Sequence, residues 1–163
     1  FKAAPKTKRE TFILATLSGT EPHRTILENR LIKSFRNSTQ KIILVRGIPK
    51  SEEKKIFPEN FTVHNHLTTS DLEKLLTSCK LLISRCGYST ISDAMVTETP
   101  VILVATKGQS EQEHLSRRLQ SKFNVPLLKE KQISEDNLQL AQKISCTSEN
   151  LLSSVIGKWV NQL

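Results

Sequence analysis

Residues 80–94 read KLLISRCGYSTISDA, an apolar run followed by a glycine turn, then hydroxyl residues and a carboxylate. A short continuous apolar run is typical of a strand buried on both faces of a parallel sheet. The turn at Gly87 and the hydroxyl groups of Ser89 and Thr90 are typical of a helix start, where free backbone amides can bind a phosphate. This stretch therefore predicts a strand, a tight turn and a helix whose N-terminus faces an anion.

Three other apolar runs also end close to a glycine. The runs are Thr11–Leu17, Lys41–Val45 and Pro100–Ala105, and the glycines that follow them are Gly19, Gly47 and Gly108. In a parallel sheet the loops that leave the strand ends form the ligand crevice, and glycine lets the backbone approach a ligand closely. Together the four junctions predict one ligand site along one edge of a sheet.

Helical patterns separate the strands along most of the chain. From Pro22 to about Arg36, three apolar residues step i, i+4 along one face, namely Leu27, Leu31 and Phe35. We expect further strands at Phe61–Leu67 and Val125–Leu128, and helices from a Ser70–Glu73 capping box to Cys79, and at Thr90–Glu98, Ser110–Phe123, Glu135–Ile144 and Glu149–Gln162. This alternation predicts an α/β fold with an open, doubly wound, Rossmann-like parallel sheet of about six strands.

Composition indicates one soluble globular domain with a basic surface. The 163 residues are 37% hydrophobic and 25% charged, and the formal net charge of +8 favours anionic partners such as nucleotide phosphates or an anionic membrane surface. Nucleic acid is not expected, because aromatic residues make up only 5% of the chain and no basic run is interleaved with them. We expect residues 1–10 to be a linker and residues 11–163 to be the domain.

No cofactor and no metal are expected. Three cysteines, Cys79, Cys86 and Cys146, are odd in number and lack metal-ligand spacing, so a reducing compartment is the default. We interpret Cys86 as a small apolar filler of the turn. His64 and His66 share one face of a strand, but without a third ligand nearby we interpret them as ordinary strand residues. No apolar run approaches the roughly 20 residues that span a bilayer.

The stretch from Ser84 to Ala94 resembles the donor-nucleotide motif of GT-B glycosyltransferases of the MurG type, glycosyltransferase family 28. That family has a Ser-Arg-Ala-Gly turn, a threonine that starts a helix and an acid three residues later. An apolar strand after proline and a loop with glutamine follow, as Pro100–Ala105 and Gln109–His114 do here. The resemblance covers roughly residues 11–128. It implies the C-terminal, donor-binding half of a GT-B architecture, with the N-terminal acceptor domain absent from this chain.

The resemblance implies a donor site at the strand ends. The backbone amides after the glycine turn and the helix dipole face the diphosphate, the acid accepts the ribose hydroxyls, and the first loop encloses the sugar diphosphate. Main-chain groups at the end of the third strand hold the base, and an acid–amide pair recognises the sugar. The residues in these roles are Ser18, Gly19, His66, Leu67, Arg85, Gly87, Tyr88, Ser89, Thr90, Asp93, Glu111 and Gln112. No catalytic residue is expected in this chain, because the resemblance places the base on the other domain.

Plainer interpretations of several residues stay open. Thr90 with Asp93 fits a capping box, and Thr20 can cap the first helix. Arg85 can steer phosphate or pair with a carboxylate. The Glu111–Gln112 pair also fits a solvated helix N-terminus, where an acid interacts favourably with the helix dipole.

The resemblance implies inverting transfer of a hexosamine, N-acetylglucosamine first, from a UDP-sugar to a lipid-linked or glycan acceptor. It implies a cytoplasmic protein, peripheral on the inner face of a membrane, and a chain that is inactive without its partner domain. Two alternatives stay open: half of a UDP-sugar epimerase or hydrolase, and a non-catalytic module that binds a nucleotide or a protein. A dinucleotide-binding Rossmann domain is disfavoured, because no GxGxxG follows the first strand.

Overall fold

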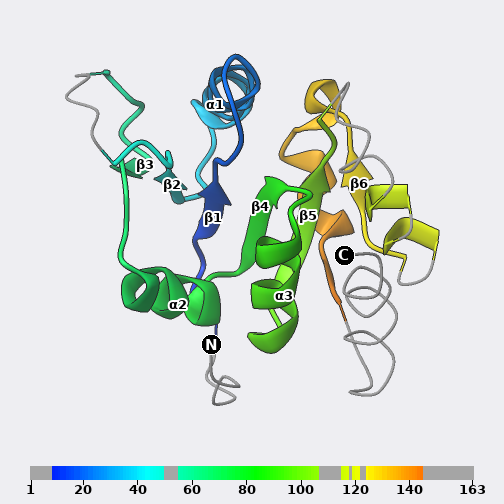
Figure 1. Ribbon diagram of the computed structural model, residues 1–163. Helices are drawn as coiled ribbons and strands as arrows, with labels where there is room; N and C mark the ends of the chain where they lie inside the picture. The colour runs from blue at the N-terminus through cyan, green and yellow to red at the C-terminus, as the bar shows by residue number, and fades with distance from the viewer. Residues whose placement is uncertain (1–8, 50–54, 107–114, 118, 122–123, 145–163) are drawn as a thin grey trace.

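The computed structural model describes residues 9–49, 55–106, 115–117, 119–121 and 124–144. Within these residues one seven-stranded sheet runs in the order β3-β2-β1-β4-β5-β6, with β7 paired to β5 (Figure 1). Neighbours along that order are parallel, and β7 is antiparallel to β5. The strands are β1 Ile13–Thr16, β2 Ile42–Val45, β3 Phe61–His64, β4 Leu81–Arg85, β5 Pro100–Val104, β6 Leu127–Leu128 and β7 Gln142–Lys143. The prediction of an open, parallel-dominated α/β sheet is confirmed.

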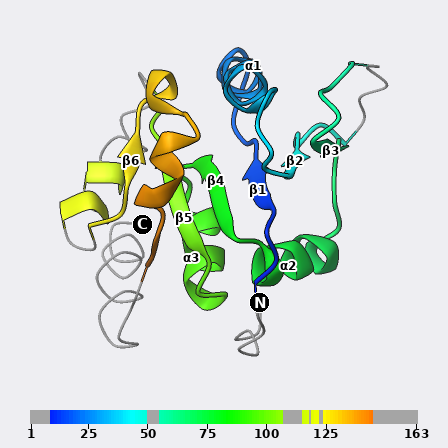
Figure 2. The ribbon, with the colours of Figure 1, turned by 180° about the vertical axis from the view of Figure 1, so that it is seen from behind.

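Helices cover both faces of the sheet. They are α1 His23–Phe35, α2 Thr69–Ser78, α3 Tyr88–Val96 and the 3-10 helices η1 Glu130–Gln132 and η2 Asp136–Leu140, with residues 115–117 and 119–121 also helical. Helix α3 lies in front of the sheet in Figure 1 and behind it in Figure 2, whereas η2 lies on the opposite face. The sheet is therefore the middle layer of three, as a doubly wound fold requires.

Two hydrophobic clusters explain why the strands are apolar without interruption. Along β1 and the residue before it, Phe12 and Leu14 belong to the cluster under α2 and α3, while Ile13 and Ala15 belong to the cluster under α1. Because successive strand side chains point to opposite faces, a strand covered on both sides needs apolar residues at every position. The predicted α1 stripe of Leu27, Leu31 and Phe35 is buried in the second cluster.

Strands β1 and β4 lie side by side at the centre of the sheet, and this pairing positions the site. From β1 the chain continues outward to β2 and β3, and from β4 it continues the other way to β5 and β6. The connections leave these two strands toward opposite faces, which opens a crevice beyond their carboxyl ends. Thr16 and Ser84 are register partners there, and Thr16 Oγ1 donates to Ser84 Oγ at 2.8 Å.

Several helix starts differ from the prediction by one or two residues. Helix α2 is capped by Thr68, whose Oγ1 accepts a hydrogen bond from the Asp71 amide at 3.2 Å, so the predicted Ser70–Glu73 capping box is wrong. Helix α3 begins at Tyr88, with Gly87 at the N-cap, two residues before the predicted start. Strand β3 ends at His64 and is shorter than predicted.

The predicted helix Glu135–Ile144 is wrong. The chain forms η2 and then β7, whose Gln142 and Lys143 pair with the start of β5. Ile133 is buried on the α1 face and Ile144 on the α3 face, so this segment crosses from one layer to the other. Pairing with an open edge of β5 satisfies backbone groups there, and a local helical pattern carries no information about that edge. The predicted helix Glu149–Gln162 lies outside the described residues.

Part of the expected linker packs on the domain. Arg9 donates to carbonyl groups at the C-terminal ends of α2 and α3, including those of Leu76, Cys79, Thr97 and Glu98, at 2.8–3.1 Å. Carbonyls at a helix end have no partner within the helix, and a cation is favourable there. The folded unit therefore includes Arg9.

Candidate functional site

The N-terminus of α3 meets the carboxyl end of β4 in a tight turn. The Gly87 amide donates to the Arg85 carbonyl at 3.0 Å, and the Ile91 amide, the first to donate within the helix, reaches the Gly87 carbonyl at 3.0 Å. The N-cap is Gly87, which has no side chain that could cap the helix. The backbone amides of the first turn therefore have no acceptor within the helix, and this end of the dipole carries partial positive charge.

Helix α1 differs from α3 at the same edge of the sheet. Its N-cap is Pro22, so Thr20 is not the cap. The carboxylate of Glu21 accepts a hydrogen bond from the Thr25 amide at 3.2 Å and pairs with Arg24 at 2.7 Å. Hydrogen bonds from Arg24, and then from Thr25, lower the pKa of Glu21. The start of α1 thus carries its own anion, whereas the first turn of α3 contains no acidic residue.

Asp93 lies one turn inside α3 and is half-buried. Its carboxylate makes no hydrogen bond or ion pair with any described residue, and burial raises the pKa of this carboxyl group. Because the N-cap is Gly87, Thr90 does not stand at the N-cap, and the capping-box interpretation of the Thr90–Asp93 pair is wrong. A half-buried carboxylate that accepts no hydrogen bond from the described residues is a group that a ligand hydroxyl can satisfy.

The loop after β1 is open and glycine-dependent. Ser18 and Gly19 are exposed, and Gly19 has φ +93°, a left-handed conformation that glycine adopts readily. Apart from its two chain neighbours, no described residue has an atom within 4 Å of the position that a Cβ would take at Gly19. The loop can therefore receive a group close to its backbone, as predicted for the diphosphate side of the site.

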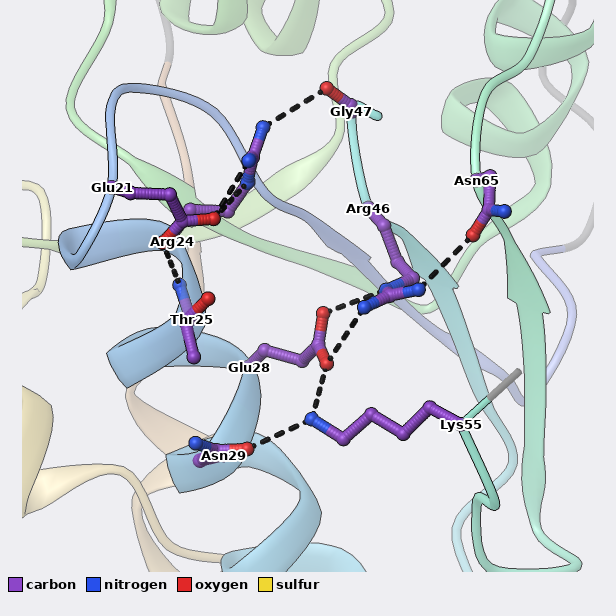
Figure 3. Close-up of polar contacts among 9 residues, drawn as sticks. All are labelled: Glu21, Arg24, Thr25, Glu28, Asn29, Arg46, Gly47, Lys55 and Asn65. Carbon is purple, nitrogen blue, oxygen red and sulfur yellow. Dashed lines mark hydrogen bonds and ion pairs between the residues drawn. The ribbon is translucent and has the colours of Figure 1, made fainter. Parts of the chain in front are cut away.

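Figure 3 shows a buried ionic cluster that the sequence analysis missed. The Glu28 carboxylate on α1 forms ion pairs with Arg46 Nε at 2.8 Å and with Lys55 Nζ at 2.5 Å. Arg46 Nη1 also donates a hydrogen bond to Asn65 Oδ1 at 3.3 Å. Glu28 and Arg46 are almost fully buried. The sequence does contain one signal for this cluster. Glu28 lies beside the apolar stripe of α1, and a carboxylate on a buried helix face requires a cationic partner. The cluster fixes the carboxyl end of β2 against α1.

A cavity of about 650 Å³ adjoins this cluster at the carboxyl ends of β2 and β3. Its lining residues are Arg46, Pro49, Lys55, Phe57, Val63, His64, Asn65 and His66. The cavity thus reaches one of the two residues predicted to hold the base, His66, and Leu67 follows it in the chain. No group of three residues suited to metal binding occurs within the described part of the chain, and the two histidines form no such site there.

A second cavity, of about 680 Å³, lies at the other end of the same edge, beyond β5 and β6. It is lined by Ala105, Thr106, Ser116, Arg117, Leu127, Lys129, Glu130 and Lys131. The predicted sugar-binding residues Glu111 and Gln112 lie outside the described residues. The two cavities lie on either side of the β1–β4 crevice, because β2 and β3 are on one side of it and β5 and β6 on the other.

Two predicted site residues pack inward. Arg85 is buried, with a side chain only 1% exposed, and pairs with Glu130, so its plainer interpretation as an ion-pair partner is the one that the geometry supports. Tyr88 is half-buried and packs against the cluster under α3. Ser89 is exposed and Thr90 is half-buried. The site surface at α3 is therefore formed by the backbone and by hydroxyl groups.

Cys86 fills the turn as an apolar residue, as the sequence analysis expected. It is fully buried, and burial raises the pKa of its thiol to about 12. Cys79 is buried too, and burial likewise raises the pKa of that thiol to about 12. A thiol that stays protonated at neutral pH is a poor nucleophile, so neither residue fits a catalytic role.

A family model and solved structures match this chain. The model of the glycosyltransferase family 28 C-terminal domain matches residues 19–152. No curated protein matches. Among solved structures, the glycosyltransferase SnogD from Streptomyces nogalater has a TM-score of 0.58 at 16% identity, over 84% of this chain and 34% of its own. The glycosyltransferase of kitacinnamycin has a TM-score of 0.62 at 15% identity, over 85% and 36%.

A third neighbour, the glycosyltransferase VinC in complex with dTDP, has a TM-score of 0.54 at 12% identity, over 85% of this chain and 35% of its own. At these identities the likeness establishes the fold. The chain spans about a third of the length of these solved glycosyltransferases. Among the described residues, no helix combines the length and apolar character of a membrane span.

Proposed function

The chain belongs to the glycosyltransferase family 28 C-terminal domain family, and we propose that it is the donor half of a two-domain glycosyltransferase that binds a UDP-sugar. The single observation that carries the proposal is the N-terminus of α3, which has no side-chain cap from its N-cap residue, on the helix where the Asp93 carboxylate has no hydrogen-bond partner among the described residues. Together they offer donors for a diphosphate and an acceptor for hydroxyl groups.

The diphosphate would lie against the first turn of α3. Amides of Tyr88 and Ser89 face it, whereas the Gly87 amide donates to the Arg85 carbonyl and shapes the turn. The Thr90 hydroxyl is within the same turn, and Ser18 and Gly19 enclose the diphosphate from the β1 side. In the reaction the leaving group is UDP, and its charge grows as the glycosidic bond breaks. Preorganised amides and a helix dipole stabilise that charge.

The nucleoside would lie from α3 toward β3. Asp93 accepts the ribose hydroxyls, and the main chain at His66 and Leu67 holds the base beside the cavity at the ends of β2 and β3. That cavity lies in the range of small-molecule pockets, which is about 300–1,000 Å³. The dTDP bound to VinC, a structure of the same fold, supports a pyrimidine diphosphate as the ligand class.

We infer the finer features from the resemblance to MurG-type enzymes. The sugar is N-acetylglucosamine, recognised by Glu111 and Gln112, and the acceptor is lipid-linked or a glycan. The general base belongs to the N-terminal domain of the whole enzyme, so this chain binds the donor without transferring the sugar. A net charge of +8 favours contact with the anionic inner face of a membrane, where a cytoplasmic enzyme meets a lipid-linked acceptor.

Calorimetric titration of the 163-residue chain with UDP tests the proposal. We expect binding that is weaker than in the whole enzyme, because only half of the cleft is present, and that survives a chelator, because α3 supplies the positive potential. ADP and GDP, at matched concentrations, test the choice of base. No heat at about 1 mM UDP, a concentration that would detect a free energy of binding near −4 kcal/mol, would overturn the proposal.

A further inference from the structure

Arg85 is the last residue of β4, directly before the turn that starts α3. It is among the largest fully buried side chains of the described residues. A guanidinium stays charged at any pH at which the protein is folded, so its burial requires compensation by hydrogen bonds and an opposite charge. The partners that supply this compensation come from three separate segments.

These partners lie at the ends of neighbouring helices and strands. Nη1 donates to the carbonyl of Ala105, directly after β5, at 2.9 Å. Nη2 donates to the carbonyl of His23, the first residue of α1, at 2.8 Å, and it also pairs with the Glu130 carboxylate. The Glu130 carbonyl in turn accepts a hydrogen bond from Arg30 Nε at 3.0 Å. One guanidinium thus joins β4, α1, β5 and η1.

We propose that Arg85 is a positioning residue that holds the donor-site loops in register and does not contact the donor. The inference rests on the proposed function, since it concerns how that site is kept in shape. His23 ends the loop that carries Ser18 and Gly19, and Arg85 itself begins the turn that leads to Gly87. The guanidinium therefore sets the spacing of the two loops that enclose the diphosphate.

Stability alone does not account for this buried cation. Arg85 Nε is buried and has no hydrogen-bond partner among the described residues. An unpaired buried N–H opposes folding, and an apolar residue of similar volume is often at least as stable as a buried ion pair. What the arginine provides is a planar fork whose two ends reach acceptors in different directions, which a lysine ammonium cannot reproduce.

The role predicts a selective loss of affinity. Among the described residues, the Arg85 guanidinium donates to the carbonyl at the start of α1, the carbonyl after β5 and the Glu130 carboxylate, and none of these belongs to β3 or its loop. When these contacts are lost, the diphosphate contacts should weaken while the base contacts at His66 and Leu67 remain. Binding of UDP should therefore fall and binding of uridine should not.

The test compares Arg85→Lys with Arg9→Lys, titrated with UDP and with uridine and followed by amide NMR shifts. Arg9 is a matched control because it also holds backbone carbonyls, but at the C-terminal ends of α2 and α3, on the opposite edge of the sheet. We expect Arg85→Lys to weaken UDP binding about tenfold or more, the size of one charge-assisted hydrogen bond, with uridine binding unchanged. Arg9→Lys should lower the melting temperature and leave the affinities for UDP and for uridine unchanged.

Glu130→Gln provides a second variant of nearly unchanged shape, and it decides the test if Arg85→Lys does not fold. It should also weaken UDP binding selectively, because Arg85 then lacks its counter-charge. Two results would overturn the positioning role while the proposed function stands, provided that the wild-type chain binds UDP. Either the substituted chain binds UDP as tightly as the wild type does, or its affinity for uridine falls as much as its affinity for UDP. If the wild-type chain binds no UDP, both are overturned.

Discussion

Asp93 presents a half-buried carboxylate on α3 that no described residue satisfies. Burial raises the pKa of this group, so the folded chain holds the proton to a higher pH than the unfolded chain does. Stability therefore falls as the pH rises through the range between the ordinary pKa of aspartate and the raised value. At neutral pH the ionised group opposes folding, which is expected of a side chain kept for a ligand.

Asp93→Asn should therefore raise the melting temperature at pH 7, and the difference from wild type should shrink as the pH is lowered through that range. Asp71→Asn is the matched control. Hydrogen bonds from Lys74, and then from Thr68, lower the pKa of Asp71, so removal of that charge should lower the melting temperature at pH 7. Thermal melts from pH 3 to pH 7 check both signs, and a lower melting temperature for Asp93→Asn would contradict the account.

The same substitution should weaken UDP binding by about 1.5–3 kcal/mol, the scale of a hydrogen bond to a charged group. A 2′,3′-dideoxy analogue lacks the ribose hydroxyls, so Asp93→Asn should hardly change its affinity. Equal losses for UDP and the analogue, measured by calorimetry, would mean that Asp93 does not contact the ribose.

At the scale of the element, two glycines at strand exits serve different purposes. Gly47 has φ +67°, and a Cβ there would stand 2.6 Å from the Leu17 carbonyl oxygen. Gly87 has φ −111° and ψ 145°, and among the described residues a Cβ there would come no nearer than 4.0 Å to Thr90 Oγ1. The backbone requires glycine at the first position. At the second, glycine leaves the start of α3 uncovered.

Gly47→Ala should lower the free energy of unfolding by about 2 kcal/mol or more, because of both strain and the clash with backbone. Gly87→Ala should change it by no more than about 1 kcal/mol, since alanine adopts that conformation freely but is a poorer N-cap than glycine. Only Gly87→Ala should weaken UDP binding in a fully folded chain, because its methyl group would stand where the diphosphate lies. Urea unfolding and UDP titration separate the two effects, and a Gly87→Ala chain with wild-type affinity would contradict the site.

The elements themselves were largely predictable, because their signals are local. Four continuous apolar runs predicted β1, β2, β4 and β5, and the i, i+4 stripe of Leu27, Leu31 and Phe35 predicted α1. Strand β7 was not predictable, since two exposed residues become a strand only by pairing with β5. The cluster of Glu28, Arg46 and Lys55 was missed for the same reason: its members are 9 to 27 positions apart, and only the fold brings them together.

At the scale of the whole molecule, the strand order explains why one edge carries the candidate site. Because β1 and β4 are neighbours, the exits of β1 and β4 lie at the centre of the carboxyl edge, and the two cavities lie toward its ends. A nucleotide-sugar has the same sequence of parts: base, ribose, diphosphate and sugar. We therefore propose that the base lies at the β3 end, the diphosphate at the centre and the sugar at the β5 end.

The assignment of the diphosphate to the start of α3 is the central claim, and backbone amide NMR during titration of the chain with UDP tests it most directly. We expect the largest shifts at the amides of Tyr88 and Ser89, with smaller shifts at His66 and Leu67. Uridine should shift only the amide signals of His66 and Leu67. If UDP binds and shifts amides elsewhere, while those at the start of α3 stay unchanged, the nucleotide site is not at this helix and the account is contradicted.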